Sequence, residues 1–498
     1  MSAPHRPELT LDPENWDELR HLGHHMLDDM FDHLRTVRER PVWRPFPEDV
    51  KRRLAEPVPH QGHPAEEVYA QFQRDVLPYP PGNTHPRFWG WVIGTGTPLA
   101  MLADMLASGM NPQAAGIQEG ARYVEERVIA WLAELMGFPT DSSGLLLSGG
   151  SMANLVALAV ARQAKAGFDV RDQGMGDGAP SLIVYASTEV HSSVRKAVEL
   201  MGMGRRQLRL IPVDAEYRIR LDELRAAITE DRRLGRRPIC VVGNAGTVNT
   251  GATDDLESLA QLCQAEGLWF HVDGAFGALV ALVPALKPLI RGLEAADSVA
   301  FDLHKWGYLP FEVGCTLVRH GDVHRDTFAV APSYLGATPR GAAAGGVLFA
   351  DLGLQLSRGF RALKVWMAFK THGVDEIGRL IAQNVDQIRY LVSLVDAEPS
   401  LERLAPAPLN ICCFRYTAPE LDADSLNAVN QEILWRLQES GVALPSHTLL
   451  DGKFAIRVAN TNQRSRRADF DLLIRTVVEL GRAVHAERRS NLVGTEGA

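Results

Sequence analysis

Residues 268–308 decide the fold of this chain: LWFHVDGAFG (268–277) and, after a connecting stretch, SVAFDLHKWGY (298–308). Each segment is a short apolar run that leads to an ionisable residue, Asp273 in the first and Lys305 in the second. Short aromatic and β-branched runs that are closed by glycine or polar residues are typical of buried strands. Because ligands bind beyond the carboxyl ends of parallel strands in an open α/β sheet, we expect Asp273 and Lys305 to face one crevice.

This acid and amine have two possible roles. A buried Asp–Lys ion pair can simply hold two strands together. Alternatively, a desolvated lysine can attack a carbonyl to form a Schiff base, while an aspartate keeps a pyridine nitrogen protonated. At about 4 Å and an effective permittivity near 20, the aspartate contributes roughly 4 kcal/mol, which is about a thousandfold in protonation. The chemical role indicates a site for pyridoxal 5'-phosphate (PLP).

Composition bounds the class of protein. The 498 residues are 46% hydrophobic and 23% charged, which is typical of a globular chain with two or three structural units. A net charge of −9 argues against nucleic acid or an anionic membrane as the main partner. Five cysteines without CxxC spacing predict buried thiols in a reducing compartment and no zinc site. Without an apolar signal or a membrane-length run, we expect a cytoplasmic protein.

The two ends of the chain predict smaller units. Residues 14–40 have helical spacing of apolar residues, and the proline-rich segment 41–86 favours an arm with short helical pieces that packs on a second subunit. Residues 97–136 predict helices. Residues 376–485 alternate strand and helix patterns and predict a small α/β domain. In this last region we expect Arg457 to form a surface salt bridge or, alternatively, to contact a substrate carboxylate.

Two glycine-containing segments can approach a ligand closely. Residues 88–96, FWGWVIGTG, predict either a core strand that enters a turn or the wall of an aromatic pocket that includes Trp91 and Gly94. The apolar run 145–147 ends in Ser148-Gly149-Gly150-Ser151 and precedes a strong helix pattern. Free N–H groups at the start of that helix could hold a phosphate. The same turn loosely matches a nucleophile elbow at Ser151, and it could also be an ordinary tight turn.

Two more strand ends carry suitable groups. The predicted strand 181–186 precedes His191, which could lie flat on a planar ligand or have a purely structural role. The predicted strand 240–244 precedes Ala245-Gly246-Thr247, which would allow close approach by a ring or a phosphate. Small, polar or ionisable groups therefore follow five successive strands, and this convergence favours a functional site.

These motifs together resemble those of the group II PLP-dependent decarboxylases, and most closely the aromatic L-amino acid decarboxylases. The motifs occur in the order of the family, and they are HPRFWGW (85–91), PLAMLADML (98–106), SGGSMANLVAL (148–158), VHSSVRKA (190–197), NAGTVNTGA (244–252), HVDGAFG (271–277), FDLHKWG (301–307) and SRGFRALKVW (357–366). The His–Lys–Trp box with an upstream HVD is highly specific, and the likeness spans roughly residues 15–485.

The resemblance implies roles for individual residues. Lys305 would bear PLP covalently, Asp273 would pair with the ring nitrogen, and His191 would stack on the ring. The other residues that the resemblance places around the cofactor are Gly150, Ser151, Thr247, Ala275, Asp302 and His304. Substrate contacts are expected from Trp91, Gly94 and His191.

The resemblance also implies an aminotransferase-like fold (PLP fold type I). We expect an N-terminal helical arm (1–86), a large PLP-binding domain with a mixed, mostly parallel sheet (87–375), and a small C-terminal α/β domain (376–498). Members of the family work as homodimers with active sites at the interface.

Three departures from the family pattern bear on the chemistry. Asp302 stands where relatives have Asn, and a carboxylate there would repel a phosphate unless it bonds elsewhere. Gly94 stands where animal enzymes have a Thr that meets the substrate carboxylate. The family's mobile loop usually carries a Tyr that protonates the substrate carbon, but residues 335–389 contain no Tyr, and Phe349 or Leu352 falls near that position. In some plant relatives, a Phe there accompanies oxidative chemistry.

The expected activity is decarboxylation of an L-amino acid, with an aromatic one favoured, to the amine and CO2. Two alternatives retain the fold: an aldehyde synthase that releases ammonia and hydrogen peroxide, and a decarboxylase of an acidic amino acid. Two others change the class of protein: a serine hydrolase that uses Ser151, and a PLP-binding protein without catalytic activity.

Overall fold

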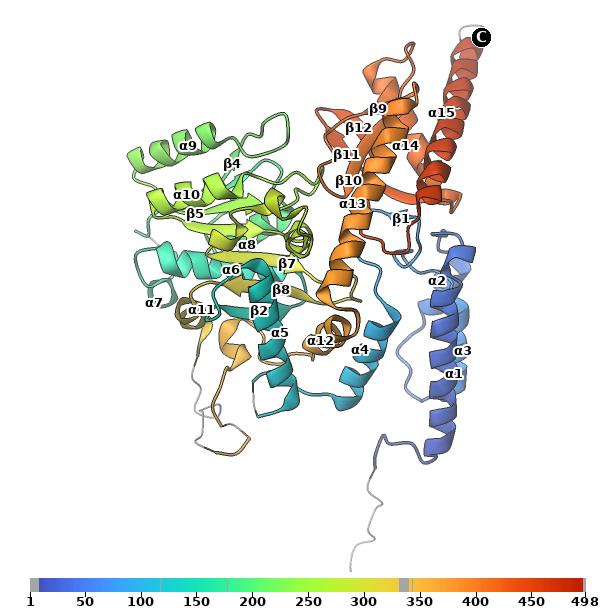
Figure 1. Ribbon diagram of the computed structural model, residues 1–498. Helices are drawn as coiled ribbons and strands as arrows, with labels where there is room; N and C mark the ends of the chain where they lie inside the picture. Colours follow the sequence, from blue (N-terminus) through green and yellow to red (C-terminus); the bar gives the residue numbers. More distant parts are fainter. Residues whose placement is uncertain (1–8, 117, 177, 331–339, 343, 496–498) are drawn as a thin grey trace, which may run out of the picture.

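The computed structural model describes residues 9–116, 118–176, 178–330, 340–342 and 344–495. Two β-sheets organise it, one of seven strands and one of five, and a helical arm stands to one side of them (Figure 1). The arm comprises α1 (Trp16–Arg35), α2 (Glu48–Leu54) and α3 (Ala65–Asp75). Helix α1 begins where the Asn15 side chain accepts hydrogen bonds from the backbone N–H groups of Asp17 and Glu18, a typical N-cap.

The seven-stranded sheet has the order β2-β8-β7-β6-β5-β3-β4. Strand β8 runs antiparallel to both of its neighbours, and the other neighbouring pairs are parallel. The bounds are β2 (Ser143–Leu147), β3 (Leu182–Ser187), β4 (Leu208–Ile211), β5 (Arg237–Asn244), β6 (Trp269–Asp273), β7 (Ser298–Asp302) and β8 (Gly314–Val318). The mixed, mostly parallel sheet confirms the fold expected from the sequence.

Helices cover both faces of this sheet, which explains why its strands are apolar almost throughout. Successive side chains of β5 point to opposite faces, so Val241 packs with the α9 and α10 side, whereas Cys240 and Val242 pack with the α6 and α8 side. The helices of this part of the chain are α4 (Pro98–Met110), α5 (Gly120–Met136), α6 (Gly150–Lys165), α7 (Val170–Gln173), α8 (Ser192–Leu200), α9 (Leu221–Arg233), α10 (Leu256–Glu266), α11 (Gly321–Phe328) and α12 (Ala362–His372).

The register of the central strands aligns the residues at their carboxyl ends. Asn244, the last residue of β5, pairs with Asp273, the last residue of β6. Asp273 in turn pairs with Ala300 of β7, two residues before that strand ends at Asp302. Three polar strand ends therefore lie along one edge, where an open α/β sheet binds its ligands.

The five-stranded sheet has the order β1-β11-β12-β10-β9, and it combines residues from distant parts of the chain. Its strands are β1 (Phe88–Trp89), β9 (Leu401–Arg403), β10 (Ile411–Tyr416), β11 (Leu444–Leu450) and β12 (Lys453–Ala459), and its helices are α13 (Val374–Ala397), α14 (Ala423–Glu439) and α15 (Arg467–Thr495). Strand β1 pairs in parallel with β11. Trp89 is fully buried, and its ring stacks on Phe470 at 4.7 Å between centroids.

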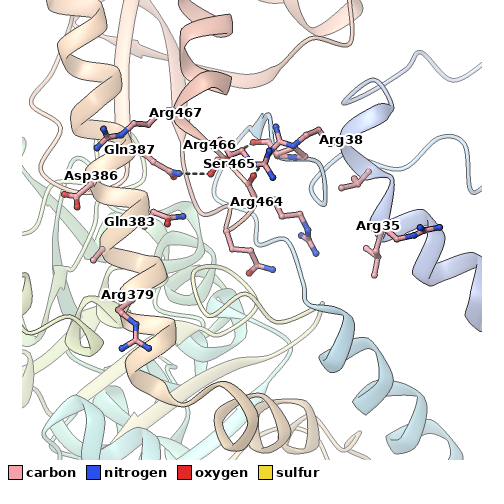
Figure 2. Close-up of a pocket in the computed structure, with 15 residues that line it drawn as sticks. Arg35, Arg38, Arg379, Gln383, Asp386, Gln387, Arg464, Ser465, Arg466 and Arg467 are labelled. Carbon is pink, nitrogen blue, oxygen red and sulfur yellow. Dashed lines mark hydrogen bonds between the residues drawn. The ribbon is translucent and has the colours of Figure 1, made fainter.

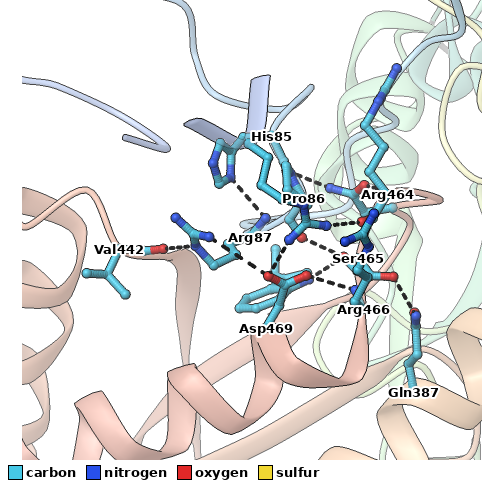
Figure 3. Close-up of polar contacts among 12 residues, drawn as sticks. His85, Pro86, Arg87, Gln387, Val442, Arg464, Ser465, Arg466 and Asp469 are labelled. Carbon is cyan, nitrogen blue, oxygen red and sulfur yellow. Dashed lines mark hydrogen bonds and ion pairs between the residues drawn. The ribbon is translucent and has the colours of Figure 1, made fainter. Parts of the chain in front are cut away.

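A polar network fixes the end of the arm to this smaller sheet (Figure 3). The buried Asp469 carboxylate accepts a hydrogen bond from Arg38 at 2.7 Å and lies 3.9 Å from Arg87. The Ser465 hydroxyl donates to the Pro86 carbonyl at 2.6 Å and accepts from the indole N–H of Trp89. The chain that leaves the arm is therefore held at the start of α15. Across the residues that the structure describes, no helix has both the length and the apolar character to cross a bilayer.

Candidate active site

A cavity of about 370 Å³ lies at the carboxyl edge of the seven-stranded sheet. The sheet and its loops supply one wall, and β11 and β12 of the smaller sheet supply the opposite wall. Its lining residues are Trp91, Val92, His191, Asn244, Gly246, Val248, Asn249, Asp273, Ala275, Phe276, Lys305, Ser446, His447 and Arg457. The structure thus brings Asp273, Lys305, His191, Ala275 and Trp91, all predicted site residues, to one cavity.

Lys305 lies on the turn that follows β7, and its amine contacts a carboxylate. Its Nζ is 2.9 Å from Oδ2 of Asp302, whose side chain is buried. Gly94 packs against the same turn. A Cβ at position 94 would lie 2.1 Å from the His304 carbonyl oxygen and 2.4 Å from that of Lys305. Gly94 is not among the residues that line the cavity, and its packing against this turn requires the absence of a side chain.

The imidazole of His191 is oriented by its own helix. His191 is the N-cap of α8, and its Nδ1 lies 3.2 Å from the backbone N–H of Ser193 and 2.8 Å from the Ser193 hydroxyl. Since the backbone N–H can only donate, Nδ1 is an acceptor and the proton of the neutral ring is on Nε2. Desolvation is the main factor that lowers the pKa of His191, with the Asp273 charge acting in the opposite direction.

A buried hydrogen-bond network, which the sequence did not predict, holds Asp273. Asn154 on α6 donates from Nδ2 to Oδ2 of Asp273 at 2.9 Å and to the hydroxyl of Ser193 at 3.0 Å. Its Oδ1 accepts from Nε2 of His271 at 2.9 Å. On the far side, Nδ1 of His271 meets the hydroxyl of Ser298 at 2.9 Å. Through Asn154, one network fixes both the carboxylate of Asp273 and the Ser193 hydroxyl that orients His191.

Burial determines the charge of His271, and the network determines which ring nitrogen carries the proton. The ring is completely buried, and desolvation lowers the pKa of His271 to about 4. The Ser298 hydroxyl accepts a hydrogen bond from the indole N–H of Trp269 at 2.8 Å, so its own proton is available for Nδ1 of His271. His271 is therefore neutral, donates through Nε2, and sets the orientation of the Asn154 amide.

The turn before α6 has the features of an anion site. Helix α6 begins at Gly150, and no side chain caps its first N–H groups. The turn also packs closely on Asp302, because a Cβ at Gly150 would lie 2.9 Å from that carboxylate. Ser151 is exposed, and among the hydrogen bonds of the described residues none joins it to a histidine. The serine hydrolase alternative therefore lacks its general base here.

Of three other residues that the sequence places around the cofactor, one lines the cavity and two do not. Ala275 lines the cavity, and its N–H donates to Asp273 at 3.2 Å. The Thr247 hydroxyl accepts from the Ala252 N–H within its own loop, and Thr247 is not part of the cavity lining. His304 is buried, with its ring 4.5 Å from that of Phe311.

The expectation that Arg457 forms a surface salt bridge is wrong. Arg457 is 4% exposed and lines the cavity. Its guanidinium donates to the carbonyls of Asn249, Trp91 and Val248 and to the hydroxyl of Ser446. Through these bonds the arginine joins the loop after β1 to the loop after β5, and it does not reach solvent.

The residues near the expected loop tyrosine do not face the cavity. Phe349 and Leu352 lie in the short helix Phe349–Leu352 and are buried against Leu145, Leu147 and Val156. The Arg358 guanidinium lies 5.1 Å from the centre of the Phe349 ring. Part of the expected mobile loop, residues 331–339 and 343, lies outside the described residues.

Comparison with known proteins places this chain in a family. Residues 47–417 match the model of the pyridoxal-dependent decarboxylase conserved domain. The chain is 36% identical over 453 residues to an aromatic-L-amino-acid decarboxylase from Bacillus atrophaeus, covering 90% of this chain and 92% of the relative. It is 27% identical to a phenylacetaldehyde synthase from Petunia hybrida, covering 90% of each.

A solved structure agrees with these sequence relatives. The structure of Oryza sativa TDC with PLP and tryptamine matches with a TM-score of 0.86 and 25% identity, over 96% of this chain and all of that one. The chain therefore belongs to the pyridoxal-dependent decarboxylase family. Within that family it is a PLP-dependent amino acid decarboxylase.

Proposed function

We propose that this enzyme decarboxylates an aromatic L-amino acid to the corresponding amine and CO2, with Lys305, Asp273 and His191 as its catalytic residues. The observation that carries the proposal is their convergence on one cavity of about 370 Å³ at the carboxyl edge of the sheet. A lysine amine for the Schiff base and a carboxylate for the ring nitrogen are the groups that a PLP site uses, and here a neutral imidazole lines the same cavity.

The residues present fit PLP. Lys305 offers the amine that a carbonyl needs, and Asp273 offers a carboxylate for a ring nitrogen. The uncapped start of α6 at Gly150 and Ser151 offers backbone N–H groups for a phosphate. The position of Gly150 against Asp302 leaves no room for a side chain. When bound, PLP supplies the electron sink that makes loss of CO2 possible.

The protein groups have distinct tasks in this proposal. Asp273, held by Asn154 and by the Ala275 N–H, would keep a proton on the ring nitrogen. His191 presents a neutral ring and an Nε2 proton to the cavity. Lys305 would hold the cofactor through its amine, and Nζ would accept a proton whenever it is free.

The lining favours a flat side chain. Trp91, Phe276 and His447 contribute rings to the cavity. Arg457 is a cation in the same wall, but its Nε and both Nη atoms already donate to oxygen atoms of the protein. An acidic side chain would therefore compete with those bonds. The aromatic-L-amino-acid decarboxylase relative supports the same choice.

An aldehyde synthase is the second candidate. It is favoured by the absence of Tyr from residues 335–389 and by the Petunia phenylacetaldehyde synthase relative. Phe349 adds no support, because it is buried away from the cavity. In that reaction O2 is consumed, and aldehyde, ammonia and hydrogen peroxide are released together with CO2.

Product analysis separates these functions. Purified holoprotein is incubated with phenylalanine, tyrosine, tryptophan, DOPA, glutamate and aspartate, and amine, aldehyde and peroxide are quantified. We expect amine from an aromatic substrate with negligible peroxide. Peroxide and aldehyde in equal amounts would establish the synthase instead. Product from glutamate or aspartate alone would refute the aromatic assignment. Lys305→Ala, which lacks the amine, should give no product with any substrate.

The proposal includes a cytoplasmic homodimer with active sites at the interface, built from an arm (1–86), a large domain (87–375) and a small domain (376–498). In support, a cleft of about 950 Å³ separates α1 from α13 (Figure 2). Arginines from three segments line it, namely Arg35, Arg38, Arg379, Arg464, Arg466 and Arg467. The side chains of Met105, Met110 and Phe311 are about half exposed or more, which suits an interface.

Light scattering and arm deletion test the assembly. A homodimer predicts twice the 54.7 kDa chain mass, and deletion of residues 1–86 should shift the mass towards the monomer. A monomer with full activity would refute the dimer. The five cysteines are free and buried, which supports a reducing compartment.

A further inference from the structure

The carboxylate of Asp302 has an unusual environment for a group beside an expected phosphate. One oxygen, Oδ2, lies 2.9 Å from Nζ of Lys305, and the other, Oδ1, is buried without a hydrogen-bond partner. Glycines surround it, because a Cβ at Gly150 or Gly314 would lie 2.9 Å or 2.6 Å from its oxygens. The carboxylate therefore cannot rotate far. Among the described residues its ionisable contacts are Nζ of Lys305 at 2.9 Å and, more distant, Nε2 of His304 at 3.9 Å.

We propose that Asp302 is the counter-ion of Lys305, holding its ε-ammonium whenever the lysine nitrogen is not bonded to the cofactor. The inference rests on the proposed role of Lys305 and gives Asp302 a positioning role instead of a phosphate contact. While the lysine is free, the ammonium next to the carboxylate compensates its negative charge.

The other charged groups around Lys305 do not take this role. His191 and His304 both have a pKa lowered mainly by desolvation, so both are neutral near pH 7. Asp273 lines the same cavity but is held by Asn154. Among the described residues, Asp302 is the one carboxylate within 4.0 Å of the lysine nitrogen.

A consequence follows for the capture of PLP. An ammonium paired with a buried carboxylate is not a nucleophile, so the lysine must lose its proton before it can react with an aldehyde. Removing the carboxylate charge makes that loss easier, because an opposite charge at this distance favours the protonated form. The residue at position 302 therefore sets the pH at which the enzyme takes up its cofactor.

The test measures the lysine itself, without relying on activity. Full-length protein is freed of PLP with hydroxylamine, pulsed with isotopic acetic anhydride from pH 6 to 11, and mapped by mass spectrometry. The exposed Lys287 serves as the internal standard for reagent reactivity. In Asp302→Asn, which keeps the shape of the side chain, we expect the labelling midpoint of Lys305 to fall by roughly one to three pH units. The rate of PLP capture should shift to lower pH in parallel.

A matched pair elsewhere provides the control. Asp104 and Lys364 are also 2.9 Å apart. Asp104→Asn should leave the midpoint of Lys305 unchanged while raising the reactivity of Lys364. An unchanged labelling midpoint of Lys305 in Asp302→Asn would overturn the inference. It would also be overturned if the midpoint of Lys305 fell as far in Asp104→Asn as in Asp302→Asn.

Two further measurements separate the possible failures. If Asp302→Asn does not fold, the labelling midpoint of Lys305 in the wild-type protein decides. A midpoint at or above the ordinary lysine value of about 10.4 supports the pair, and a midpoint below that value overturns it. Borohydride reduction of holoprotein, followed by peptide mapping, tests Lys305 as the PLP-bearing residue independently. Failure of that mapping would reject the proposed function, whereas the labelling result concerns the ion pair alone.

Discussion

Replacing Asn154 by leucine should weaken both the fold and the hold on PLP. Leucine is similar in size to asparagine but has no polar atoms. The substitution removes the 2.9 Å hydrogen bond to Asp273 and leaves Nε2 of the buried His271 without its acceptor. The Ser193 hydroxyl, which orients His191, loses a donor as well. A single change on α6 therefore disturbs two predicted catalytic residues.

The magnitude follows from these contacts. A hydrogen bond to a charged group contributes about 1.5–3 kcal/mol, and a buried donor left unsatisfied costs about 1–3 kcal/mol. Together these effects predict that the free energy of unfolding falls by roughly 2.5–6 kcal/mol. If the whole free energy of the lost hydrogen bond to Asp273 is subtracted from the free energy of PLP binding, PLP affinity should fall about tenfold to a hundredfold.

Two assays and one control test this reasoning. Urea unfolding of the PLP-free protein gives the stability change, and fluorescence titration with PLP gives the affinity. Asn430 is a matched control, because it is fully buried in the small-sheet region and makes three hydrogen bonds, to the backbone of Tyr416 and Leu426. Asn430→Leu should lower stability without changing PLP affinity per folded molecule. A loss below about 1 kcal/mol in Asn154→Leu, or equal affinity effects in both variants, would refute the argument.

Three further predictions concern other parts of the molecule. Gly94→Ala should lower PLP affinity at least tenfold, because its Cβ would overlap the carbonyl oxygens of His304 and Lys305. The control Gly109→Ala has open space around its Cβ and should leave PLP affinity unchanged. Identical PLP titrations of the two variants would contradict this prediction. Burial lowers the pKa of His271 and His324 to about 4, below the unfolded value near 6.5. The unfolded state therefore binds more protons in that window, and urea unfolding should show each histidine lowering stability by about 1.4 kcal/mol per pH unit as pH falls from 6.5 to 4. Removing either histidine by substitution with asparagine should flatten that slope. Asp469→Asn should loosen the arm by about 1–3 kcal/mol, seen as faster proteolysis within residues 9–86; an unchanged cleavage rate would count against the network of Figure 3.

The strand ends could be predicted because their signal is local. Asp273 and Lys305 each follow a short apolar run, and the carboxyl-edge rule converts that pattern into a shared crevice. The structure places both in one cavity. His191 follows the same logic. The position of a residue after a strand does not show where its hydroxyl points. The hydroxyl of Thr247, for example, accepts a hydrogen bond within its own loop.

The supporting network could not be derived from spacing, because its members belong to different elements. Asn154 is the one polar residue within the apolar stretch 152–161, and His271 lies inside an apolar strand. Both patterns indicate a buried polar group that needs a partner. Neither pattern names that partner, which depends on how α6 crosses the sheet. Arg457 gave a similar signal within FAIRVA, and the surface salt bridge expected for it was wrong.

The pairing of β1 with β11 has a consequence for how the protein is made. Phe88 and its partner Leu444 are 356 residues apart (444 − 88). At roughly 5–20 residues per second, a ribosome needs about 20–70 s to deliver the second after the first. During that interval the indole of Trp89 has neither its strand partner nor Phe470 to cover it. The arm and the smaller sheet must therefore be completed last. A transcript truncated before codon 444 would yield a chain in which Arg38 and Trp89 lack the partners that hold the arm to the smaller sheet.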